Sequence, residues 1–123
     1  MTEIKLYHNF LICAKLFYMK SQKQSKPQRE AEIEKYFIWA VQSIEGKSYK
    51  FKSMTMRGVA DRIACFPDGS TWFVELKAPN GRLSALQEVF AEDITKLNQR
   101  YVCLWSKEQI NDWIAQVGYG YAL

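Results

Sequence analysis

The sequence WFVELK at residues 72–77 has the composition of a buried β-strand, because aromatic and aliphatic side chains dominate it. Alternate side chains of a strand point to opposite faces, so Glu75 and Lys77 lie side by side on one face. A core strand that is purely structural has no need of an acid and a base at its end. The segment therefore predicts a central strand whose last residues are functional.

A second carboxylate precedes this strand at Asp61, where another apolar run, residues 63–66, begins. The sequence PDGS at residues 67–70 separates the two runs and is typical of a tight hairpin turn. Such a hairpin places Asp61 and Glu75 at the same end of adjacent strands. Two carboxylates with Lys77 beside them form a candidate site for a hard divalent cation.

The charge distribution points to an anionic substrate. The chain has 123 residues, enough for one domain with a modest core, and a formal net charge of +4. The first 29 residues hold six Lys or Arg and one Glu, and residues 47–82 hold seven Lys or Arg against three acids. A basic excess around the two carboxylates suits a phosphodiester backbone.

Several classes of protein are disfavoured by composition. Cys13, Cys65 and Cys103 are odd in number and lack C-x-x-C spacing, so disulfides and zinc are not expected. His8 is the only histidine, which argues against histidine-based catalysis. No apolar stretch has transmembrane length, and no signal peptide is recognisable. We expect a cytoplasmic protein without a membrane partner.

Residues 1–28 are predicted to be a basic N-terminal extension or linker, and residues 29–123 the folded domain. Helical periodicity begins at residue 29 and continues to residue 44, with an apolar stripe centred on Phe37 and Val41. Glu30 falls almost in line with this stripe and Glu34 at its edge. Glu30 is therefore favoured as an acid facing the sheet, although decoration of the helix N-terminus would explain it as well.

The remaining periodicity predicts three antiparallel strands, a helix, a strand and a last helix. Residues 49–52 alternate as a strand, and Gly46 is expected to end the first helix. Ser84 and Gln87 form a capping box before a helix that reaches about Asn98. Its apolar stripe contains Leu86, Val89, Phe90, Ile94 and Leu97. Residues 101–105 form a strand, which a crossover connection makes parallel to the strand at 72–77. The fold class is α/β, with an α-β-β-β-α-β-α core and a mixed sheet flanked by helices.

Six segments resemble, in order, the VRR-NUC family of nucleases within the PD-(D/E)xK superfamily. The resemblance covers about residues 29–117, and the family usually has proline where this chain has Ala60. The matching segments are RExxIE (29–34), YKF (49–51), RGVADR (57–62), FVELKAP (73–79), GRLS (81–84) and LQ (86–87).

The resemblance implies a restriction-endonuclease-like fold and a metal-dependent DNA endonuclease that hydrolyses phosphodiester bonds with Mg²⁺ or Mn²⁺. Stand-alone members of this family, many from phage, look like homodimers that can cut branched DNA such as Holliday junctions. It further implies the cytoplasm of a bacterial or phage-infected cell as the location.

The resemblance also implies roles for individual residues. Asp61 and Glu75 would ligate the metal together with the Leu76 carbonyl group. Lys77 would orient or help to deprotonate the attacking water, or stabilise developing negative charge. Glu30 would hold a metal-bound water or a second ion.

Gln87 would orient Lys77 or a phosphate, or serve only as the capping-box side chain. The candidates for contacts with the DNA backbone are Lys50, Arg57, Arg62 and Arg82. The main alternative is a non-catalytic nucleic-acid-binding module with a nuclease-like fold. Such modules usually lose part of the acid–acid–lysine set, which this sequence retains in full.

Overall fold

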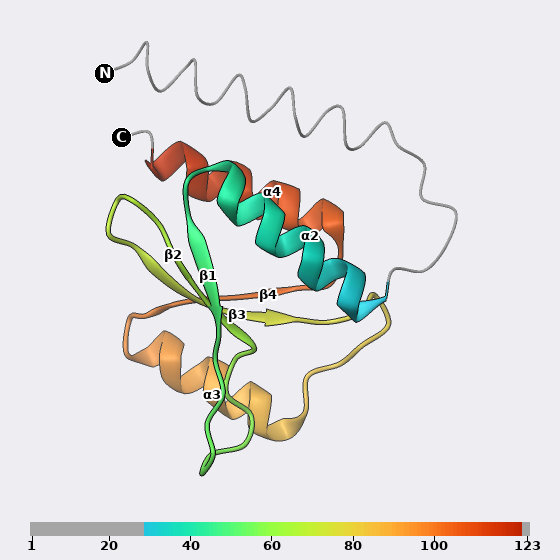
Figure 1. The fold of residues 1–123 in the computed structure, drawn as a ribbon. Coiled ribbons are helices and arrows are strands. Elements are labelled where there is room, and N and C mark those ends of the chain that lie inside the picture. Colours follow the sequence, from blue (N-terminus) through green and yellow to red (C-terminus); the bar gives the residue numbers. More distant parts are fainter. Residues whose placement is uncertain (1–28, 122–123) are drawn as a thin grey trace.

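The computed structural model describes residues 29–121, so the predicted extension at residues 1–28 lies outside the described part of the chain. The elements follow the predicted order (Figure 1). They are α2 (Glu30–Ser43), β1 (Lys47–Lys50), β2 (Arg62–Cys65), β3 (Thr71–Leu76), α3 (Ala85–Lys96), β4 (Arg100–Leu104) and α4 (Lys107–Tyr121).

The four strands form one mixed sheet in the order β1-β2-β3-β4. β1 and β2 pair antiparallel, as do β2 and β3, whereas β3 and β4 run parallel. The predicted meander and crossover are therefore confirmed. Helices α2 and α4 cover one face of the sheet, and α3 lies on the other (Figure 1).

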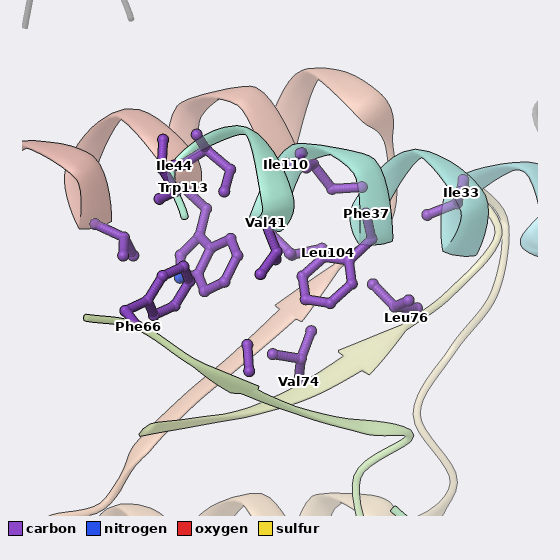
Figure 2. Close-up of a cluster of buried hydrophobic side chains, with 14 residues drawn as sticks. Ile33, Phe37, Val41, Ile44, Phe66, Val74, Leu76, Leu104, Ile110 and Trp113 are labelled. Carbon is purple, nitrogen blue, oxygen red and sulfur yellow. The ribbon is translucent and has the colours of Figure 1, made fainter. Parts of the chain in front are cut away.

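The main core lies between the sheet and the pair of helices α2 and α4 (Figure 2). Phe37 is fully buried and its ring stacks on Trp113, with centroids 5.6 Å apart. The rings of Trp113 and Phe66 form a T-shaped pair with centroids 5.8 Å apart. The aromatic side chain of Trp113 therefore stabilises the monomer. The other buried residues of this core are Ile33, Ala40, Val41, Ile44, Ala64, Val74, Leu76, Leu104, Ile110, Ile114 and Val117.

A smaller aromatic layer lies under α3, where the rings of Phe51, Phe73 and Tyr101 surround that of Phe90. The apolar stripe predicted for this helix is only partly right. Phe90 and Ile94 are half-buried, but no residue of α3 is fully buried. The other members stay exposed: Leu86 by 52%, Val89 by 51% and Leu97 by 67%. The narrow sheet covers only part of the apolar face of this short helix.

Helix α2 ends in a Schellman motif. Glu45 adopts a left-handed conformation with φ of 66°, and the Gly46 amide donates to the Val41 carbonyl at 3.0 Å. The left-handed position is thus Glu45, one residue before the predicted Gly46. Glycine is needed at 46 for a different reason, because a Cβ atom there would lie 2.6 Å from the Phe66 ring.

Local hydrogen bonds account for the other predicted turns and caps. In the β2–β3 turn, the Asp68 carboxylate accepts from the Ser70 amide at 2.8 Å, and Gly69 has φ of 87°. Strand β1 begins and ends two residues earlier than predicted, and β4 shifts by one residue in the same direction. No helix in residues 29–121 combines the length and the hydropathy that crossing a membrane requires.

Candidate active site

The sheet register brings the two predicted carboxylates together. Arg62 pairs with Val74, so Asp61, one residue before β2, lies opposite Glu75 near the end of β3. The Leu76 amide donates to Asp61 Oδ2 at 2.9 Å, which fixes the carboxylate against the neighbouring strand. The Asp61 carbonyl group accepts from the Phe51 amide at 2.9 Å. Asp61 is therefore held through both its side chain and its backbone.

Glu75 is buried, with an exposed fraction of 1%. Its Oε1 atom accepts from Gln87 Nε2 at 3.1 Å and lies 4.0 Å from Lys77 Nζ. Burial raises the pKa of Glu75 to about 8, reinforced by the hydrogen bond to Asp61 and by its charge, while Lys77 acts in the opposite direction. The pair of carboxyl groups therefore tends to retain a proton near neutral pH, which reduces the negative charge beside Lys77.

Gln87 forms the predicted capping box and also contacts the site, although through a partner that was not predicted. Its Oε1 atom accepts from the Ser84 amide at 2.8 Å, and Ser84 Oγ accepts from the Gln87 amide at 3.2 Å, which completes the predicted capping box. Its Nε2 atom is then directed to Glu75 rather than to the predicted partner, Lys77. The start of α3 thus orients a carboxylate of the site.

A cleft of about 170 Å³ opens beside Asp61. Carboxylate and carbonyl oxygens at this position suit a hard cation such as Mg²⁺ or Mn²⁺. Within residues 29–121, no three His, Cys, Asp or Glu side chains gather around one point, so backbone oxygen and water would have to complete the coordination. The residues that line the cleft, called the site cleft below, are Glu30, Glu34, Lys50, Phe51, Lys52, Asp61 and Leu76.

The two glutamates of α2 differ in their surroundings. Glu30 is exposed at the first position of the helix, lines the site cleft and adds to the negative charge acting on Glu75. The prediction that Glu30 faces the sheet is only partly right, because its side chain is exposed although it lines the site cleft together with Asp61. Glu34 is paired with Arg62, with 2.9 Å between Oε1 and Nη1.

Arg62 has a structural role instead of the predicted contact with DNA. It is 7% exposed, and its guanidinium donates to Glu34, to Ser48 Oγ at 3.1 Å and to the Ser48 carbonyl at 3.4 Å. This network joins α2 to β1 and β2 directly beside Asp61. The other three predicted DNA-contacting bases, Lys50, Arg57 and Arg82, are exposed.

Strand β4 adds neighbours that were not predicted. The parallel register pairs Cys103 with Glu75 and places Tyr101 two residues earlier on the same face. Burial raises the pKa of Cys103 to about 12, so the thiol stays protonated. Burial also raises the pKa of Tyr101, whose hydroxyl is buried without a hydrogen-bond partner among the described residues. Extending the period of two from β3 to β4 would have placed both residues beside Glu75.

The chain is similar to known proteins in sequence and in fold. No family model matches the sequence. Over 59 residues the chain is 44% identical to "Putative nuclease p44" of Acyrthosiphon pisum secondary endosymbiont phage 1. The alignment covers 48% of this chain and 63% of that relative, which is less than two thirds of its length.

A solved structure described as "VRR_NUC domain" has the same fold. The two structures superpose with a TM-score of 0.67 at 24% identity, over 69% of this chain and 92% of that chain. The predicted α/β fold is thereby confirmed, and it is similar to the fold of a VRR_NUC domain.

Proposed function

We propose that this chain, which has the fold of a VRR_NUC domain, is a divalent-metal-dependent nuclease that hydrolyses phosphodiester bonds in DNA. The observation that carries the proposal is the placement of Asp61 opposite Glu75 at adjoining strand ends, with Lys77 Nζ 4.0 Å from Glu75. The relative named as a nuclease supports the same reaction class.

Asp61, Glu75 and the Leu76 carbonyl group are the residues that would hold Mg²⁺ or Mn²⁺. When bound, the cation supplies charge neutralisation at the phosphate and a more acidic water molecule. The Lys77 ammonium group, with its side chain 18% exposed, orients the attacking water or stabilises negative charge that develops during hydrolysis. Gln87 keeps the Glu75 carboxylate in place from the first turn of α3.

Exposed bases in the site cleft and in two loops supply the proposed contacts with DNA. Lys50 and Lys52 line the cleft, and Arg57 and Arg82 are exposed in the loops that precede Asp61 and α3. Contacts of this kind position the phosphate backbone without reading sequence. DNA binding should therefore weaken as the salt concentration rises.

The activity can be tested by incubating the pure protein with linear, flap and four-way-junction DNA, with and without Mg²⁺ or Mn²⁺. Metal-dependent cutting supports the proposal, with junction DNA expected to be cut best. Binding without cutting in every metal condition would favour the non-catalytic nucleic-acid-binding module instead.

A symmetric homodimer is part of the proposal, because resolution of a four-way junction needs two coordinated cuts and each domain presents one site. A two-fold axis would supply the second site. Light scattering at micromolar concentration should give twice the monomer mass of 14.4 kDa. A monomeric mass together with equal cutting of junction and duplex would contradict the homodimer.

Glu30→Gln and Glu34→Gln should affect different properties. Glu30 is exposed at the site cleft, so its substitution should lower the turnover rate and raise the metal requirement without changing the melting temperature. Glu34→Gln weakens the bond to buried Arg62, so it should lower stability by about 1 kcal/mol and the melting temperature by about 5 °C, with little effect on turnover. A lower turnover rate for Glu34→Gln, with an unchanged rate for Glu30→Gln, would mean that Glu34 serves the site.

A further inference from the structure

The connection between β1 and β2 carries two exposed apolar side chains. Residues 51–61, called the β1–β2 loop, extend past α3 on the side away from α2 and α4 (the green loop in Figure 1). Met54 is 103% exposed and Met56 63% exposed at its tip. Ser53 Oγ accepts from the Met56 amide at 3.0 Å and from the Thr55 amide at 3.4 Å, which gives the tip a defined turn.

The base of the loop is firmly attached. Gly58 has φ of 86°, and a Cβ atom there would lie 2.5 Å from the Leu86 backbone, so the loop packs closely on the first turn of α3. Phe51 packs against Phe73 and Phe90. The bond between the Phe51 amide and the Asp61 carbonyl closes the loop. The methionines are thus carried on a fixed stem that ends at Asp61.

The charge of this segment indicates what the methionines meet. Residues 47–60 contain four Lys or Arg and neither Asp nor Glu. Phe51, Lys52 and Asp61, which form the two ends of the loop, line the site cleft. A ligand bound in that cleft therefore contacts the basic stem of the loop, and only a ligand long enough to continue along the loop reaches its apolar tip. DNA matches both parts, because its phosphates are anionic and its bases present apolar faces.

We propose that Met54 and Met56 insert as a wedge into DNA that is held at the site cleft and contact bases that are unstacked at a branch, which rests on the proposed nuclease function. Flexible thioether side chains adapt to irregular apolar surfaces. Apolar wedges of this type separate base steps, which costs unstacking free energy in an intact duplex. That cost is smaller at a branch, where stacking is already interrupted. The wedge therefore favours branched over linear DNA.

The test compares wild type with a Met54→Ser, Met56→Ser double variant, and uses Leu97→Ser as a matched control. Leu97 is 67% exposed at the far end of α3, outside the proposed contacts. Fluorescence anisotropy in EDTA measures the affinity for a four-way junction and for a linear duplex of equal length. A 2-aminopurine base at the branch reports unstacking. Melting curves verify that each variant is folded.

The double variant should bind the junction about tenfold more weakly, which corresponds to about 1.4 kcal/mol. It should also lose the 2-aminopurine signal that reports unstacking at the branch. Its affinity for the duplex should change by much less, and Leu97→Ser should match wild type on both DNAs. Equal losses on the two DNAs, or no loss on either, would overturn the wedge. A fall in molecular mass with unchanged DNA affinity would also overturn it, because the methionines would then contact protein.

The outcomes separate this inference from the proposed function. If wild type cuts DNA with Mg²⁺ or Mn²⁺ while the double variant retains full preference for the junction, the wedge fails and the nuclease function stands. If wild type binds neither DNA, both fail.

Discussion

Asp61→Asn should lower the rate of DNA cleavage by at least about a thousandfold, because residues that act together in a site lose most of their joint effect when one is removed. The substitution keeps an oxygen that can accept from the Leu76 amide, so the strand ends should stay in place. It also removes a negative charge in contact with Glu75, which is 1% exposed. The melting temperature in EDTA should therefore be equal to or higher than that of wild type.

Lys77→Ala should abolish cleavage in the same assay while DNA binding is largely retained. Asp93→Asn provides a matched control, because Asp93 is an exposed acid near the end of α3. Its cleavage rate should equal that of wild type. Undiminished cutting by Asp61→Asn would mean that the pair of carboxylates does not take part in catalysis.

Phe37→Ala should have the largest effect on stability, with a loss of about 4 kcal/mol, as is typical for truncation of a buried phenylalanine. Phe37 has an exposed fraction of 0% and stacks on Trp113, so its removal opens a cavity between α2, α4 and the sheet. For a domain of this size the melting temperature should fall by about 20 °C. Chemical denaturation followed by circular dichroism measures the loss.

Trp39→Ala is the matched control for this prediction. Trp39 lies on the same helix and is 45% exposed, so its truncation should cost much less than that of Phe37. A larger loss for Trp39 than for Phe37 would mean that α2 is packed on a different face. That result would also move Glu30 away from the site cleft.

The fold and the carboxylate pair were predictable because short-range signals determine them. The alternation around β3, the turn at residues 67–70 and the capping box at Ser84 each identify an element or its boundary. Once the hairpin is recognised, its register alone places Asp61 opposite Glu75.

Features that depend on how separate elements pack were not predictable to the same degree. The pairing of Arg62 with Glu34 requires the rotation of α2 over the sheet, which periodicity gives only approximately. Residue 30 lies on the apolar side of the helix but is exposed, because it borders the open site cleft at the first position of α2. Cys103 approaches Glu75 only through the parallel pairing of strands separated by a helix.

The central claim is that Asp61 and Glu75 act with a divalent cation in DNA cleavage. Its most direct test is the time course of junction cleavage by the full chain in EDTA, followed by addition of excess Mg²⁺ or Mn²⁺, with Asp61→Asn measured in parallel. We predict no cutting in EDTA, cutting by wild type once either cation is in excess, and none by Asp61→Asn in any condition. Full cutting in EDTA would contradict the claim.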